Sequence, residues 1–210
     1  MSEQSPLSLG TEDIKKLLMR YAVPAIVAMT AASLYNMMDS IFIGHGVGAL
    51  GIAGLAVTFP FINLAAAFGS LVGVGASTLV SVKMGQKDLK SAEAVLGNVL
   101  LLNTVIGFLF MTVCLIFLDP ILYFFGASAD TLPYARDYMK VILYGNLITH
   151  IYMGLNEVMR ASGYPQRAMM ATLFAVLING VLNALFIFVL DMGIKGAALG
   201  TICAPVSYTH

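Results

Sequence analysis

Charged side chains are scarce in this sequence. Only 10% of its 210 residues are Asp, Glu, Lys or Arg, whereas 59% are hydrophobic, and the mean hydropathy is +0.89. Soluble domains carry about 25% charged residues and roughly 45–50% apolar ones. Because so few charges cannot cover a surface that faces water, the composition excludes an ordinary soluble domain. It predicts a protein whose solvent is the lipid bilayer.

Cysteine is also rare, and the only two, Cys114 and Cys203, both stand in apolar runs. We interpret them as small hydrophobic residues in lipid or helix contacts rather than as a disulfide or a metal site. Histidines and cysteines show no cluster with metal-ligand spacing, so no metal or organic cofactor is expected. The 11 basic and 11 acidic residues cancel, which gives no indication of a nucleic-acid partner.

Long apolar segments separated by short polar turns fill the chain after the polar residues 1–16. A helix needs about 20 mainly apolar residues to cross a bilayer. The sequence therefore predicts an all-α, polytopic transmembrane bundle with about five full membrane helices and the beginning of a sixth. Pro24, inside the first helix, is a candidate bend point. The expected helices cover residues 17–44, 51–82, 92–118, 134–161 and 166–190, and the sixth covers residues 197–204.

Basic residues are divided unevenly between the two ends of these helices. Cytoplasmic loops of membrane proteins carry an excess of Lys and Arg. The amino terminus is therefore expected in the cytoplasm, in a multi-pass protein of the inner (plasma) membrane. Eight basic residues flank the amino-terminal side, Lys15, Lys16, Arg20, Lys83, Lys87, Lys90, Arg160 and Arg167, against three on the other, Arg136, Lys140 and Lys195.

Four polar residues inside the expected membrane helices form the candidate site. Asp39 lies near the outer end of the first helix, where an ionisable group costs ~2.5–3.5 kcal/mol on insertion scales and is a candidate for function. Asn36 is one turn earlier on nearly the same face, and Asn179 and Asn183 are an i, i+4 pair in the fifth helix. Because odd-numbered helices run in the same direction, Asp39 and Asn183 are expected at similar depth.

The group formed by Asp39 and its neighbouring carboxamides can be interpreted in two ways. Oxygen-bearing groups at one depth can bind a proton or a small cation. The alternative is a structural hydrogen bond between helices, worth about 0.6–2 kcal/mol. The residue pattern alone leaves both open.

Other motifs favour structural interpretations. Gly69 and Gly73 form a small-xxx-small pattern that predicts close helix packing. His150 is expected to make an interhelical hydrogen bond rather than to relay protons. Glu157 and Arg160 are one turn apart and predict a local ion pair. The sequence contains no nucleophile-base-orienter pattern, so we do not expect an enzyme.

The run Met38-Asp39-Ser40-Ile41-Phe42-Ile43-Gly44-His45 resembles the opening of the multidrug and toxic compound extrusion family, the MATE transporters. The other similar stretches have the order and spacing of the family, and together they span residues 15 to about 203. These stretches are 44–56, 84–86, 137–142, 160–165, 179–183 and 193–201.

The resemblance implies a protein of two six-helix lobes with a substrate cavity between them, of which this chain resembles the first. It implies export of organic, often cationic compounds driven by inward flow of H+ or Na+. Asp39 matches the aspartate of a cation-responsive cluster in prokaryotic members, and Tyr138, Asn179, Asn183 and Thr201 match its other positions. Some members have aspartate where this chain has Asn183, so only Asp39 can titrate here and the coupling ion stays open.

The resemblance also sets the expected organisation. Residues 17–204 are expected to form the first lobe, cut inside its sixth helix, with a missing second lobe as a partner and a non-native tail over residues 205–210. Two alternatives remain. A flippase of lipid-linked oligosaccharides would favour a basic central cavity, and the mid-membrane regions contain no Lys or Arg. A structural or interaction subunit of the membrane is the other.

Overall fold

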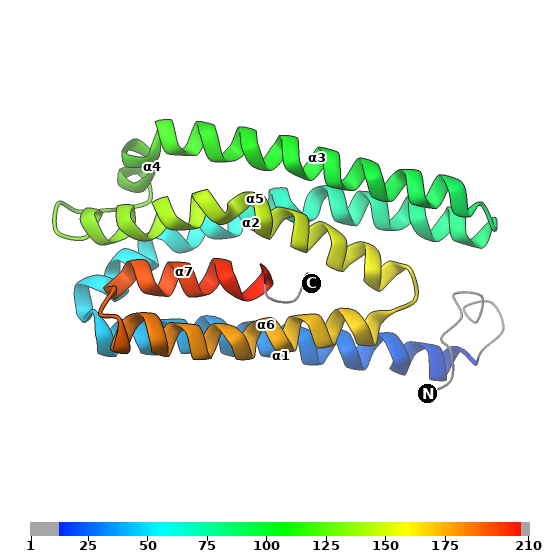
Figure 1. Cartoon of the computed structure of the whole chain (residues 1–210), viewed down its shortest axis with the longest axis horizontal. Coiled ribbons are helices and arrows are strands. Elements are labelled where there is room, and N and C mark those ends of the chain that lie inside the picture. The colour runs from blue at the N-terminus through cyan, green and yellow to red at the C-terminus, as the bar shows by residue number, and fades with distance from the viewer. Residues whose placement is uncertain (1–12, 207–210) are drawn as a thin grey trace.

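The computed structural model describes residues 13–206 and is helical almost throughout, which confirms the expected all-α bundle. Of the expected terminal segments, residues 1–12 and 207–210 lie outside the described part. Every predicted helix is present, and residues 118–124 form an additional short helix. The long helices run along one common axis, and the short helix α4 lies across it (Figure 1). The elements are α1 (Ile14–Gly46), α2 (Ala49–Gly85), α3 (Leu89–Ile116), α4 (Leu118–Phe124), α5 (Leu132–Ala161), α6 (Pro165–Ala184), the π-helical turn η2 (Leu185–Val189) and α7 (Gly193–Val206).

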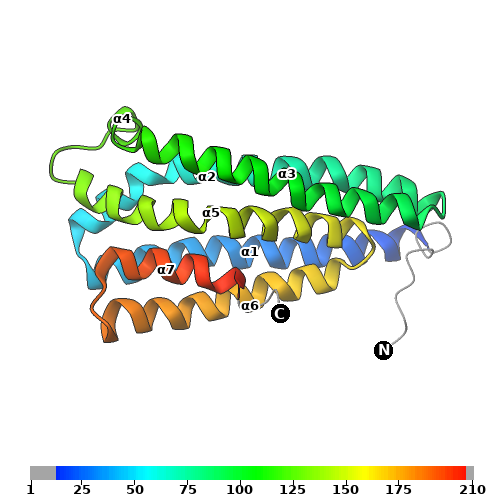
Figure 2. The ribbon, with the colours of Figure 1, turned by 45° about the horizontal axis from the view of Figure 1, so that its top comes forward.

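Four helices are long and apolar enough to cross a membrane, namely α1, α2, α3 and α6 extended by η2. The helix α5 is 30 residues long but buries polar side chains such as Asn146, His150 and Asn156. It packs against α2, α3, α6 and α7 and lies inside the bundle (Figure 2). Because α5 contacts protein more than lipid, it does not need the apolar surface of the other spans.

The long helices and α7 form two groups of three, and the central helix α5 belongs to the first group. One group contains α2, α3 and α5, and the other contains α1, α6 and α7. Contacts between α5 and α7 join the groups. The short helix α7 covers only part of the length of the bundle (Figure 1).

Small residues on α2 allow α5 to approach closely. A methyl group added at Gly73 would lie 2.8 Å from the Cα atom of Gly154, and one at Gly69 would lie 3.2 Å from the ring of His150. Side chains larger than hydrogen do not fit at such distances from a neighbouring backbone. The predicted packing role of Gly69 and Gly73 is therefore confirmed.

Helix ends are fixed by local residues. Asp13 caps α1 by accepting from the amide of Lys15 at 2.8 Å, and Asp88 caps α3 by accepting from that of Ser91 at 3.2 Å. Gly48 opens the turn before α2 with φ of +93°, which is strained for other residues. Pro165 occupies the first turn of α6, where its missing amide hydrogen leaves no bond unmade.

A hydrophobic cluster at the α4 end of the bundle holds the helices in register. Residues of α1, α2, α5 and η2 meet there, and Ile43, Phe61, Met139 and Ile187 are each at most 2% exposed. Cys114 packs into the same cluster as a small hydrophobic residue. The cluster also includes Tyr138 of α5, and this packing turns the tyrosine toward the interior.

Candidate functional site

A buried carboxylate is the centre of the candidate site. Asp39 on α1 is only 5% exposed although it lies within a membrane helix. The side-chain amide of Asn183 on α6 donates to its Oδ1 atom, and the hydroxyl of Thr201 on α7 donates to its Oδ2 atom at 3.4 Å. One carboxylate therefore connects the three helices of its group.

Two carboxamides one turn apart on α6 lie beside this carboxylate. Asn179 and Asn183 are 1% and 0% exposed, and the Nδ2 atom of Asn183 donates to the Oδ1 atom of Asn179 at 3.0 Å. With the Asn179 amide turned over, its nitrogen donates to Asp39 at 3.1 Å and its oxygen accepts from the backbone amide of Thr201 at 3.2 Å. Because an amide carries both donor and acceptor atoms, this pair can adapt to a change at Asp39.

Two tyrosines complete the cluster. Tyr35 lies one turn before Asp39 on α1, and its side chain lies close to the carboxylate and to Thr201. Tyr138 of α5 is 3% exposed, and its hydroxyl also interacts with Thr201 and lies close to the charge of Asp39. Tyr35 was not among the predicted site residues, although its i−4 spacing from Asp39 was a usable signal.

Asn36 does not join the cluster, contrary to the expectation from its position. Its side chain is exposed, and its amide donates to the Ala32 carbonyl of the same helix at 3.1 Å. Asn36 lies about 60° to one side of Asp39 around the helix and Tyr35 about 40° to the other side, so the buried face can include Tyr35 and leave Asn36 outside. The structure places Asn183 and Thr201 within hydrogen-bonding distance of Asp39, with Asn179 and Tyr138 beside them.

Close packing of α7 on α6 brings Thr201 to the carboxylate. A methyl group added at Gly200 would contact the side-chain oxygen of Asn183. Glycine therefore leaves the space that this amide fills. The π-helical turn η2 follows α6 and begins two residues after Asn183, where a continuous α-helix was expected. Its Ile187 packs against Gly46 of α1.

The hydrogen-bond donors and acceptors of the site are not all paired, and this permits ligand binding. An ionised carboxylate only accepts hydrogen bonds, and the polar neighbours of Asp39 are neutral. The Oδ1 atom of Asn183 is buried without a hydrogen-bond partner among the described residues. If the amide turns, this oxygen can accept from a protonated Asp39 or contact a small cation. The described residues contain no group of three acidic, histidine or cysteine side chains that could hold a metal ion.

The remaining polar candidates are structural. The Nδ1 atom of His150 bonds the Asn146 carbonyl of its own helix at 2.8 Å, so the expected interhelical bond is wrong. The imidazole ring packs instead against Gly69 and lies 6.1 Å from the ring of Phe110. The predicted ion pair between Glu157 and Arg160 is confirmed at 3.8 Å.

Several known proteins are similar to this chain. The model of the MatE family matches residues 24–185. The multidrug export protein MepA of Staphylococcus haemolyticus (strain JCSC1435) is 29% identical over 201 residues, which cover 96% of this chain and 44% of that protein. MepA of Staphylococcus aureus (strain MRSA252) is 29% identical over 91% of this chain and 43% of its own length. The chain thus spans about half the length of the curated relatives it matches.

Solved structures agree with this result. A multidrug resistance MATE family transporter of the MOP superfamily, in an outward-facing conformation, matches with a TM-score of 0.90 and 28% identity, covering 97% of this chain and 45% of that one. A MOP superfamily transporter from Pyrococcus furiosus matches with a TM-score of 0.89 and 28% identity over the same shares. The fold of this chain is therefore that of one half of such a structure.

Proposed function

Because the chain belongs to the MatE family, we propose that it forms one lobe of a secondary active transporter that exports small organic, often cationic compounds. In this proposal the lobe works with a second lobe of the same plan, and the substrate passes between the two by alternating access. The relatives named as multidrug export proteins support this substrate class. The driving ion is H+ or Na+, and Asp39 is the residue that responds to it.

The observation that carries the proposal is the isolation of the Asp39 charge. The carboxylate is buried at the junction of α1, α6 and α7, and its neighbours Asn183, Thr201 and Tyr35 contribute only neutral dipoles. Taking an ionised carboxylate out of water without a counter-charge is costly. Binding of a proton or a sodium ion would remove that cost. The relief of this cost favours binding of the ion to the cluster.

Neutralisation of Asp39 changes which hydrogen bonds the helices need. In the ionised state, the carboxylate attracts donors from α6 and α7 toward α1. A protonated carboxyl donates one bond itself and attracts the remaining donors less strongly. The amide of Asn183 can then present its unpartnered oxygen, and α1 can move relative to α6. This is how occupancy of the ion site would reach the substrate cavity between the lobes.

The two candidate ions make different demands on the same residues. A proton requires one acceptor oxygen, which Asn183 supplies after its amide turns. A sodium ion requires several hard oxygens, which Asp39, Asn179, Asn183 and Thr201 together carry. The cluster therefore has the groups needed to bind either a proton or a sodium ion, and efflux under separate gradients distinguishes the two ions.

The test compares Asp39→Asn with Asn36→Ala in a transporter in which this lobe is joined to a second lobe. Reconstituted vesicles are given either a proton gradient or a sodium gradient, and efflux of a cationic dye is followed. We expect Asp39→Asn to abolish gradient-driven efflux. Asn36→Ala is the matched control, since Asn36 lies one turn away on α1 and outside the cluster, and it should transport normally.

The outcomes separate the interpretations. Wild-type efflux under only one gradient identifies the coupling ion. Efflux by Asp39→Asn at the wild-type rate under both gradients would assign Asp39 a purely structural role. Dye efflux by the 210-residue chain alone would contradict the requirement for a second lobe.

A further inference from the structure

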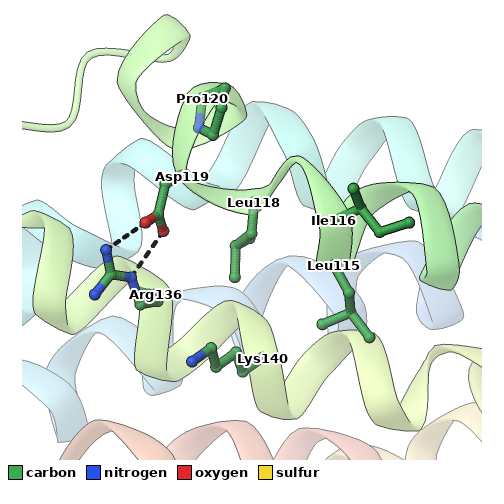
Figure 3. A pocket seen from close by; sticks show the side chains of 7 residues that line it. All are labelled: Leu115, Ile116, Leu118, Asp119, Pro120, Arg136 and Lys140. Carbon is green, nitrogen blue, oxygen red and sulfur yellow. Dashed lines mark hydrogen bonds and ion pairs between the residues drawn. The ribbon is translucent and has the colours of Figure 1, made fainter.

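A second polar feature lies at the α4 corner of the bundle, away from Asp39. A cavity of about 450 Å³ opens there between α3, α4 and α5 (Figure 3). Apolar side chains of α3 and α4, including Leu115, Ile116 and Leu118, form one part of its wall. Its charged lining residues are Asp119, Arg136 and Lys140. The cavity therefore combines a hydrophobic wall with a charged one.

The charged wall has an excess of one positive charge. Arg136 donates to both carboxylate oxygens of Asp119, with a distance of 2.7 Å from Nε to Oδ1 (Figure 3), so these two charges satisfy each other. Lys140 follows Arg136 by one helical turn and is exposed. No described residue makes a hydrogen bond or ion pair with its ammonium group within bonding distance. Lys140 is thus the cation of this cavity that is available to a ligand.

The position of Lys140 along α5 places it near the boundary between acyl chains and headgroups. Lys140 lies eight residues after the first residue of α5, about 12 Å along the axis. A 30-residue helix is about 45 Å long and exceeds a hydrocarbon core of about 30 Å, so its ends project into the headgroup regions. From this depth the long side chain of a lysine reaches the headgroup level.

The surroundings of the cavity are suited to lipid. Ile116 is 68% exposed and Phe124 is 85% exposed, and both face outward at this corner. Large apolar side chains with this exposure, on helices that cross a membrane, contact acyl chains. A molecule bound here would meet apolar surface on one side and an ammonium group on the other.

We propose that this cavity binds the phosphate-bearing headgroup of an anionic membrane lipid, in the leaflet at the α4 end of the bundle. Lys140 pairs with the lipid phosphate, and an acyl chain lies along Leu115 and Ile116. The carboxylate of Asp119 would repel the phosphate, but Arg136 occupies both of its oxygens. The lipid would bridge α3 and α5 and so stabilise the corner made by α4.

The test uses the purified chain in nanodiscs that contain phosphatidylglycerol or phosphatidylcholine, followed by native mass spectrometry to count retained lipids. We expect retention of phosphatidylglycerol to exceed that of phosphatidylcholine. Lys140→Gln should lower the phosphatidylglycerol excess about fivefold, the effect of one basic residue near a membrane surface. Lys140→Arg should restore it, because the charge is restored.

Lys195→Gln is the matched control. Lys195 is also exposed near this end of the bundle, but it pairs with Asp137 at 3.2 Å and does not line the cavity. It should retain lipid like wild type. Equal retention by wild type and Lys140→Gln, or an equal loss in Lys195→Gln, would overturn the proposal. Displacement of the lipid by millimolar inorganic phosphate would show a soluble-anion site and would also overturn it.

Discussion

The side-chain amide of Asn183 on α6 donates a hydrogen bond to the carboxylate of Asp39 on α1, across 144 positions of the sequence. This contact is buried on both sides, and it joins the first long helix of the chain to one of the last. Because the Asn183 side chain is neutral, this contact leaves Asp39 as the one carboxylate at the junction of the two helices.

Asn183→Asp should make the stability of the chain depend on pH. The variant places two carboxyl groups in contact, and two adjacent carboxylates repel each other unless a proton or cation lies between them. We expect its thermal unfolding midpoint in detergent to fall, relative to wild type, as the pH rises from 5 to 9. Asn183→Leu is the control, since it removes the hydrogen bond without adding a charge and should give a pH-independent loss. A constant difference between Asn183→Asp and wild type would argue against the contact.

Gly73→Ala should destabilise the packing of α2 on α5. The new methyl group would lie 2.8 Å from the Cα atom of Gly154, and the backbone cannot move aside cheaply. Overpacking of this kind costs about 1–3 kcal/mol. Gly75→Ala is a control in the same helix, because a methyl group there meets nothing within 4 Å. Chemical denaturation of both variants should show the loss for Gly73→Ala alone; equal midpoints would contradict the close approach.

The contact between Asp119 and Arg136 should weaken in acid. The hydrogen bonds from Arg136 lower the pKa of the Asp119 carboxyl below its ordinary value, with a further contribution from Lys140. A carboxyl whose folded pKa is lowered stabilises the fold above its ordinary pKa and loses that stabilisation as the pH falls through the lowered value. The difference in unfolding midpoint between wild type and Asp119→Asn should therefore be full at pH 7 and shrink below about pH 4.

Salt provides an independent check on the same pair. Both side chains are partly exposed, at 37% and 43%, so their attraction is screened by mobile ions. Raising the salt concentration at pH 7 should reduce the difference between wild type and Asp119→Asn. A difference insensitive to both pH and salt would mean that the substitution acts through packing.

The membrane orientation can be tested at two exposed turns. The turn after α2 and the loop before α5 lie at opposite ends of the bundle (Figure 1). Gln86 belongs to the turn and Asp130 to the loop, and both are exposed. From the uneven distribution of Lys and Arg, we propose that the Gln86 end faces the cytoplasm. Single cysteines at these positions, in a background without Cys114 and Cys203, should react with an impermeant thiol reagent in intact cells only at position 130. Labelling at position 86 alone would reverse the orientation.

Sequence alone determined the helical architecture, because the length and apolar content of a membrane helix are local properties. It also placed Asp39 and Asn183 at one depth, since depth follows from counting residues along helices of known direction. Close packing at Gly69 and Gly73 was predictable for a similar reason, as small residues four apart fall on one face. The family resemblance added Tyr138 and Thr201, which residue patterns by themselves did not indicate.

Tertiary structure decided the rotation of each helix about its own axis. Asn36 faces outward and Tyr35 faces the carboxylate because packing of α1 on α6 selects which side is buried. His150 satisfies its Nδ1 atom within α5 because Gly69 and Phe110 surround its ring with apolar surface. The cavity at Lys140 likewise exists only because α4 folds back beside α5 and brings Asp119 to Arg136. Hydropathy values give little information on such rotations in a membrane protein, since lipid and protein interior are both apolar.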